Sequence, residues 1–179
     1  LVNNGGISQR GLAEETDLTV VRRIMEVNFF GTVNLTRTVL PTMLDRSVGH
    51  LVVISSLVGK FGTPQRSAYS ASKHALHGWF DSLRAEVHDR GLRVTLICPG
   101  FIKTEVSMNA LTADGTAQNT KDEATARGMA PQELAARIIQ AVESERDEVY
   151  IGGRETIGVF LKRFFPRLFN RMIRKRKVI

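Results

Sequence analysis

Two strand-like runs in which apolar residues predominate constrain the fold of this chain more than any other feature. One run covers 49–55 and includes Val52, Val53 and Ile54, and the other covers 92–98. Strands that are apolar along their whole length are usually buried on both faces, as they are in parallel sheets. Helical patterns stand before and after the first run. The sequence therefore predicts βαβ units and an α/β fold.

Two shorter strand patterns extend this prediction to about four parallel strands. Leu1 and Val2 resemble the end of a buried strand, and 148–151 form the last one. The predicted helices cover 17–46, with Asp17 as the N-cap, then 67–89, and a third that begins at Pro131. Residues 105–129 are small, polar and irregular, which is typical of a functional or disordered connection.

The composition favours one globular domain in a reducing compartment. The chain has 179 residues, of which 42% are hydrophobic and 24% are charged, and Cys98 is its single cysteine. That count excludes an internal disulfide framework, and no apolar run approaches the ~20 residues of a membrane span. We therefore expect a cytoplasmic protein. Cys98 ends an apolar strand and is expected to be buried.

A tyrosine and a lysine four residues apart are the main candidates for chemistry. Tyr69 and Lys73 fall in the predicted helix 67–89, and residues four apart share one helix face. A nearby ammonium favours the phenolate, so we expect Lys73 to lower the pKa of Tyr69 and tune it for proton transfer. A bare Tyr-x-x-x-Lys pattern also fits a half-exposed aromatic residue beside a solvated charge.

For the serines and histidines near this pair, the sequence fits a structural role as well as a functional one. Ser56 follows an apolar strand, where ligands bind in parallel sheets, so its hydroxyl is a candidate for contacting a substrate oxygen. Ser55 is expected to cap the following loop. His74 and His77 are three residues apart, but the sequence places no third ligand candidate with them, and we predict no metal site.

Several motifs agree in order and spacing with one enzyme family. They are Asn3-Asn4-Gly5-Gly6, Asn28, Ser56, Tyr69, Lys73 and the segment Pro99-Gly100-Phe101-Ile102-Lys103-Thr104. Together they resemble the short-chain dehydrogenase/reductase family from residue 1 to about residue 152. The resemblance implies a Rossmann-like doubly wound parallel sheet and hydride transfer between NAD or NADP and a carbonyl or secondary alcohol.

The resemblance also implies a role for each matching residue. Tyr69 would be the acid/base, Lys73 would lower its pKa and hold the ribose hydroxyls, and Ser56 would polarise the carbonyl. Asn28 would kink its helix and hold a water that relays protons, although it also fits a tolerated polar residue on a helix flank. The implied cofactor-binding residues are Asn3, Gly5, Tyr69, Lys73, Pro99, Gly100, Ile102 and Thr104. Thr104 is also a candidate helix N-cap, and both roles can hold.

The main departure from the family is at the start of the chain. The glycine-rich turn that cradles the pyrophosphate precedes Asn3-Asn4-Gly5-Gly6 in the family, and no such cluster occurs here. We therefore interpret residues 1–153 as the C-terminal part of the catalytic domain, with four strands where the family has seven. We expect the first strand to expose an edge, and this chain alone to bind cofactor poorly and turn over little.

The chain's net charge of +7 comes from its tail, 154–179, because the rest of the chain is nearly neutral. Residues 160–179 contain eight Lys or Arg and no acid, and two apolar stripes recur every four residues with a break expected at Pro166. A basic amphipathic helix of this kind favours an anionic membrane surface, which hints at a lipophilic substrate. Contact with a partner subunit or the substrate cleft stays open. Nucleic acid is disfavoured, because no groove-reading motif accompanies the charge.

Two further expectations concern the whole protein. The family pairs the helix that contains Asn28 and the helix that contains Tyr69 across a subunit interface, so the resemblance implies a homodimer or tetramer. The alternative to an enzyme is a membrane-associated or partner-binding module that keeps the family's appearance without catalysis.

Overall fold

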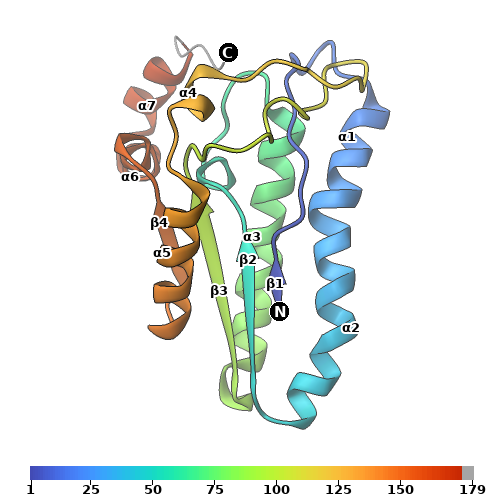
Figure 1. Ribbon diagram of the computed structural model, residues 1–179, viewed down its shortest axis with the longest axis vertical. Coiled ribbons are helices and arrows are strands. Elements are labelled where there is room, and N and C mark those ends of the chain that lie inside the picture. The colour runs from blue at the N-terminus through green and yellow to red at the C-terminus, as the bar shows by residue number, and fades with distance from the viewer. Residues whose placement is uncertain (175–179) are drawn as a thin grey trace.

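The computed structural model describes residues 1–174 and contains one parallel sheet flanked by helices (Figure 1). Its strands are β1 (Val2–Asn3), β2 (Gly49–Ile54), β3 (Leu92–Pro99) and β4 (Glu148–Ile151), in the order β1-β2-β3-β4. All three pairings are parallel, with Val52 opposite Thr95 in the centre. The predicted α/β fold with four parallel strands is therefore confirmed.

Alternate residues of the central strands face two separate cores. Leu51, Val53 and Leu96 are fully buried against Leu76 and Phe80 of α3 (Ser67–Val87). The opposite face, which includes Val52, Ile97 and Ile151, packs against α5 (Pro131–Glu143). Complete burial of each such side chain contributes about 1.5–3 kcal/mol. Helices on both faces explain why these strands carry apolar side chains on both of their faces.

The helix predicted over 17–46 is three consecutive elements. These are α1 (Leu18–Met25), a single π-helical turn (Glu26–Phe30) and α2 (Gly31–Asp45). Asp17 is the predicted N-cap, and its side chain accepts a hydrogen bond from the Thr19 amide at 2.7 Å. A π-turn contains one residue more than a normal turn and changes the direction of the helix. The expected kink at Asn28 therefore lies inside this turn.

The connection 105–129 is irregular but well anchored. It contains only the short helix α4 (Glu123–Ala126), and Ser107, Asp122 and Thr125 are buried. Short 3₁₀ turns at Leu57–Gly59, His88–Arg90 and Arg154–Thr156 complete the elements. α5 begins with Pro131 in its first turn, as predicted. The irregular connection crosses the carboxyl ends of β2 and β3 and so roofs that end of the sheet (Figure 1).

The tail forms two helices that meet at Pro166. These are α6 (Ile157–Phe164) and α7 (Pro166–Ile173), so the predicted break is confirmed. Most of one apolar stripe packs on the body: Phe169 is buried with its ring 5.0 Å from that of Phe61, and Leu161 and Ile173 pack beside it, whereas Phe165 is exposed. The other stripe is exposed, with Phe160, Phe164, Leu168 and Met172 each about half accessible or more. Lys175 and Arg176, which also belong to the predicted basic segment, lie outside the described residues.

Among residues 1–174, no helix combines the length and the apolar character that crossing a bilayer requires.

Candidate active site

A pocket of about 460 Å³ opens beyond the carboxyl ends of β2 and β3. It brings together many of the residues singled out in the sequence: Ser56, Tyr69, Lys73, Pro99, Gly100, Ile102 and Thr104 all line it. In parallel sheets this is the expected place for a ligand. Asn3, Gly5 and Asn28, which were also expected to belong to the site, are not part of its wall.

Ser56 is held at the end of β2 by two weak contacts. Its hydroxyl accepts a hydrogen bond from the Val58 amide at 3.3 Å, which caps the 3₁₀ turn, and donates to the Pro99 carbonyl at 3.5 Å. The expectation that Ser55 caps this loop is wrong. The Ser55 hydroxyl is buried and lies 3.0 Å from Nε2 of His77, and it also contacts the Lys73 carbonyl. Ser56 is therefore the serine that the pocket can use.

Tyr69 and Lys73 lie on the first turns of α3 and face the same pocket, as their spacing predicted. The Lys73 ammonium is 5.9 Å from the centre of the Tyr69 ring. It donates a hydrogen bond of 2.8 Å to the carbonyl of Ile54, the last residue of β2. This bond fixes the buried amine between the helix and the sheet.

The predicted lowering of the Tyr69 pKa by Lys73 is wrong in direction. Burial raises the pKa of the Tyr69 phenol, and this effect outweighs Arg66, the Ser56 hydroxyl and Arg10, which lower it. Burial also lowers the pKa of the Lys73 ammonium to about 8. The physical reason is that loss of water disfavours the charged form of both groups. Tyr69 is therefore a protonated phenol at neutral pH, which suits a proton donor.

Asn28 lies behind the pocket wall and ties three segments together. Its side chain accepts a hydrogen bond from the Ile7 amide at 2.8 Å and donates to the Ile7 carbonyl at 2.9 Å and to the Ser72 hydroxyl at 3.0 Å. Gly6 passes so close that a Cβ there would lie 3.2 Å from Asn28 Oδ1 and 3.5 Å from Lys73 Nζ. The side chains of Asn28 and Lys73 thus both lie close to Gly6.

The turn after β1 contributes different residues from those expected. The Asn3 amide is buried and donates to the Thr36 hydroxyl at 3.0 Å, so it joins β1 to α2. Gly5 is exposed, with no atom within 4 Å of a Cβ built on it. Their neighbours Asn4 and Gly6 line the pocket instead. Residues of a strand alternate between faces, and the sequence did not reveal which members of this turn point inward.

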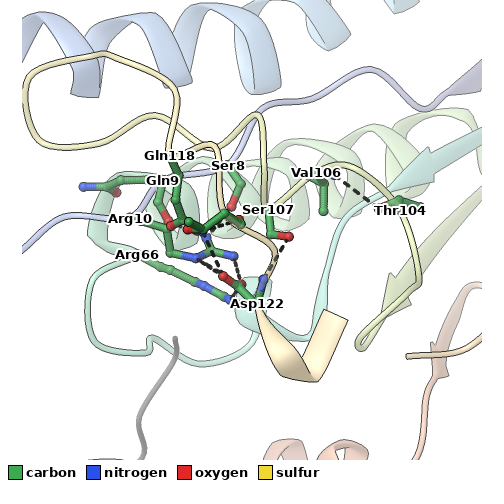
Figure 2. A network of polar contacts seen from close by, with 10 residues as sticks. Ser8, Gln9, Arg10, Arg66, Thr104, Val106, Ser107, Gln118 and Asp122 are labelled. Carbon is green, nitrogen blue, oxygen red and sulfur yellow. Dashed lines mark hydrogen bonds and ion pairs between the residues drawn. The ribbon is translucent and has the colours of Figure 1, made fainter. Parts of the chain in front are cut away.

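The segment after β3 lies along the other wall. The Phe101 amide donates to Glu155 at 3.3 Å, which links this wall to the 3₁₀ turn before α6. Thr104 is not a helix N-cap. Its hydroxyl accepts from the Val106 amide at 3.5 Å within a non-helical turn (Figure 2). The side chain lines the pocket, so its expected role toward a ligand stays a proposal.

His77 has neighbours that the sequence did not place beside it. Cys98 and Glu148 bring one ligand atom each within 4.8 Å of the imidazole, so the expectation of no further ligand candidate is wrong. The Lys60 ammonium, however, lies 3.0 Å from Glu148 and 3.5 Å from His77, where a metal cation would be repelled. Burial also raises the pKa of the Cys98 thiol well above its usual range. This chemistry disfavours metal binding.

Two arginines and an aspartate on the pocket's rim were also missed. Arg10 and Arg66 both line the pocket, and both form ion pairs with Asp122 of the irregular connection (Figure 2). All three side chains are at least nine-tenths buried. No spacing rule could have found this cluster, because Asp122 lies 112 residues from Arg10 and 56 residues from Arg66.

Comparison with known proteins points to one family. The family model described as short chain dehydrogenase matches residues 1–115. A zebrafish (Danio rerio) protein named dehydrogenase/reductase SDR family member 7B is 44% identical over 177 residues, which are 98% of this chain and 57% of that protein. A Drosophila melanogaster protein named dehydrogenase/reductase SDR family protein 7-like is 44% identical over 179 residues, 99% of this chain and 55% of that protein. The chain thus spans about half the length of the curated relatives it matches.

Solved structures show the same fold. A short chain dehydrogenase from Burkholderia cenocepacia in complex with NADP superposes with a TM-score of 0.81 at 26% identity, covering 98% of this chain and 68% of that one. A short chain dehydrogenase/reductase from Burkholderia phymatum in complex with NAD also gives a TM-score of 0.81, at 22% identity, covering 100% of this chain and 68% of that one.

Proposed function

This chain belongs to the short-chain dehydrogenase family, and on that premise we propose that it supplies the proton-transfer site of an NAD(P)-dependent oxidoreductase acting on a carbonyl compound or a secondary alcohol. The observation that carries the proposal is the meeting of Ser56, Tyr69 and Lys73 in one pocket at the carboxyl ends of the strands. A module without catalysis would not need this meeting, so we do not favour that alternative.

Each of the three side chains has a part in carbonyl reduction. The Tyr69 phenol, kept protonated by burial, donates its proton to the carbonyl oxygen as negative charge develops there. The Ser56 hydroxyl lines the same pocket and donates a hydrogen bond to that oxygen. The Lys73 ammonium, 5.9 Å from the phenol ring, stabilises the phenolate that remains. In the reverse direction Tyr69 accepts the proton from the alcohol.

Asn28 does not line the pocket and supports the reaction indirectly. Its bonds to Ile7 and Ser72 hold the turn after β1 against α3, and α3 carries Tyr69 and Lys73. We propose that it also anchors the water relay that returns a proton to Lys73. The close approach of Gly6 to both side chains supports this role, because a larger residue would crowd the space between them.

The wall residues fit a nicotinamide cofactor. Bound NAD(P)H would supply the hydride. We propose that Lys73, Tyr69, Pro99, Gly100, Ile102 and Thr104 hold it, because all six line the pocket. Asn3 and Gly5 are proposed to support it through the turn whose neighbours Asn4 and Gly6 reach the pocket. The NADP in the Burkholderia cenocepacia structure supports this class of cofactor, and both NAD and NADP remain in the proposal.

Replacing Tyr69 by Phe tests the proposal directly. In a protein extended at its N-terminus to the full length of its relatives, Tyr69→Phe should lower ketone reduction at least about 100-fold, the usual share of a general acid. Cofactor binding, measured by nicotinamide fluorescence, should change little. Phe165→Leu, which changes an exposed aromatic residue of the tail, is the control. Reduction by Tyr69→Phe at the rate of the unmodified protein would refute the assignment.

A second proposal concerns the exposed stripe of the tail. We propose that α6 and α7 rest on an anionic membrane surface. Phe160, Phe164, Leu168 and Met172 are exposed, and exposed Arg163, Arg167 and Arg171 stand beside them. No acid occurs after Glu155. Each cation near an anionic surface contributes about 1 kcal/mol, and the aromatic residues add apolar burial.

Vesicle co-sedimentation tests this surface. We expect the protein to bind vesicles that contain phosphatidylglycerol and to bind neutral phosphatidylcholine vesicles weakly. Phe160→Ser combined with Phe164→Ser should abolish binding, since both rings are more than half exposed and their loss spares the core. Leu18→Ser, a change at an equally exposed residue of α1, is the control. Unchanged binding by the double variant, or by a chain that ends at Gly158, would contradict the proposal.

The oligomeric state is proposed from the family alone. A homodimer or tetramer would cover Val27, Phe30 and Leu35, which are exposed along the π-turn and α2.

A further inference from the structure

Two positive charges share one negative charge at the rim of the candidate active site. Arg10 follows β1, Arg66 immediately precedes α3, and Asp122 comes from the irregular connection (Figure 2). Arg10 binds Asp122 through Nε, at 3.2 Å, and through Nη2, and Arg66 binds it through Nη2 at 3.1 Å. Their exposed fractions are 7% for Arg10, 8% for Arg66 and 1% for Asp122. The cluster is therefore desolvated.

The remaining contacts do not balance the charge. Arg10 also donates to the Ser8 hydroxyl at 2.9 Å and to the Gln9 carbonyl, and Gln118 donates to Asp122 at 3.1 Å. These partners are neutral. Within residues 1–174, Asp122 is the sole carboxylate that pairs with either guanidinium. A buried net positive charge is unfavourable unless an anion compensates it.

Arg66 has hydrogen-bond donors to spare. Of its three nitrogens only Nη2 has a partner within the described residues, and Nε is buried without one. The hydroxyl of Thr63, on the loop before α3, is also buried and unpaired. Unsatisfied buried donors are rare in proteins because each costs about 1–3 kcal/mol. Burial and the repulsion from Arg10 lower the pKa of Arg66 to about 10, and Asp122 offsets this shift only in part.

These donors belong to the same cavity as the proton donor. Thr63, Arg66 and Arg10 line the pocket together with Ser56 and Tyr69. Arg66 is the N-cap residue of α3, three positions before Tyr69, so it lies about one helical turn from the phenol. Leu57, Val58 and Phe61 provide an apolar wall. The pocket thus combines a proton donor, an apolar surface and an uncompensated cation.

We propose that Arg66 and Thr63, supported by Arg10, bind an anionic group of the substrate, so that the substrate is an apolar carbonyl compound that also carries a carboxylate or a phosphate. This inference rests on the proposed function for the carbonyl end of the substrate. It adds the second point of attachment that would orient the carbonyl toward Tyr69 and Ser56. The shared chemistry is an oxyanion, and carboxylate and phosphate are separate arms of the test.

The test compares acid and ester forms of one ketone. The N-terminally extended protein is assayed with 9-oxodecanoate, with its methyl ester, and with the methyl ketone 9-oxodecyl phosphate. We expect a higher kcat/KM for at least one anion than for the ester. Arg66→Met should reduce that preference by about 10- to 100-fold, the range of one charge-assisted hydrogen bond. Thr63→Val should reduce it about 3- to 10-fold, mostly through KM.

Controls separate binding of an anion from support of the fold. Arg127→Gln removes a guanidinium that is exposed on the surface and should leave the preference unchanged. If Arg66 merely anchors Asp122, then Arg66→Met will slow acid and ester equally, and that result overturns the proposal. If Arg66→Met fails to fold, the acid-to-ester ratio is measured in Arg66→Lys and Thr63→Val instead. An unchanged acid-to-ester ratio in both would overturn it too.

A binding measurement separates this inference from the proposed function. Decanoate has the carboxylate but no carbonyl, so its binding by calorimetry does not require catalysis. Decanoate binding that is weakened at least about 10-fold by Arg66→Met supports the anion site even if no ketone is reduced. Reduction of ketones without any preference for the anion, together with no binding of decanoate, overturns the anion site and leaves the proposed function standing.

Discussion

At the scale of single residues, burial decides the chemistry of the site more than charge pairing does. The spacing of Tyr69 and Lys73 correctly predicted that they face one pocket. It gave the wrong direction for the pKa of Tyr69, because the cost of burying a phenolate cannot be read from neighbours in the sequence. Burial therefore keeps the Tyr69 phenol protonated at neutral pH, which suits the proposed proton donor. The pKa of Lys73, at about 8, lies close to that pH.

The pH dependence of reduction follows from Lys73. Its pKa of about 8 means that the ammonium is charged below that pH and neutral above it. Reduction needs the charged form to stabilise the phenolate, so kcat/KM should fall as pH rises through about 8, roughly tenfold per pH unit for a single group. In Lys73→Gln this alkaline limb should disappear from a much slower reaction. An unchanged limb in that variant would contradict the assignment.

The residues missed by sequence reasoning share one property. Arg10, Arg66 and Asp122 are far apart in the chain and meet only through tertiary packing. Each alone resembles an ordinary surface charge, and charged residues are mostly exposed. Ser56 was identifiable because it directly follows an apolar strand. Only the role of Ser55 as a loop cap was predicted wrongly, since its buried partner His77 comes from a distant part of α3.

At the scale of elements, the π-turn at Asn28 is the feature that joins fold to function. The sequence predicted one kinked helix over 17–46, and the structure resolves it into α1, the π-turn and α2. The extent of the π-turn was not predictable. It depends on the hydrogen bonds of Asn28 with Ile7 and Ser72, which lie outside the helix. The four-residue α4 was missed for a similar reason, since helices this short depend on tertiary contacts.

Replacing Asn28 by Ala tests the structural part of its role. Asn28 is fully buried, and the change leaves the amide and the carbonyl of the half-buried Ile7 without their side-chain partner. We expect the free energy of unfolding to fall by about 2–4 kcal/mol, measured by urea denaturation with circular dichroism. Asn34→Ala, on the exposed side of α2, should change it by no more than about 0.5 kcal/mol. Equal stability of both variants would show that the Asn28 bonds contribute little.

At the scale of the whole molecule, the apolar pattern of the strands was enough to predict the sheet. The run that contains Val52 and Val53 and its counterpart in β3 predicted buried parallel strands, and the structure places helices on both faces of them. The packing of the tail was not predictable in the same way. Its two stripes look alike in the sequence, yet Phe169 is buried on Phe61 and Phe164 is exposed. Which stripe meets the body depends on how the turn before α6 leaves β4.

The central claim is that this pocket reduces a carbonyl by direct hydride transfer from a nicotinamide, with Tyr69 as the proton donor. The most direct test supplies NADH and NADPH that carry deuterium at both C4 positions to the N-terminally extended protein, together with a ketone in ordinary water. Mass spectrometry then locates the label in the alcohol. The account predicts one deuterium on the carbinol carbon and hydrogen from solvent on the oxygen. An alcohol that contains no deuterium, or a labelled cofactor that remains unconsumed with every ketone supplied, would contradict it.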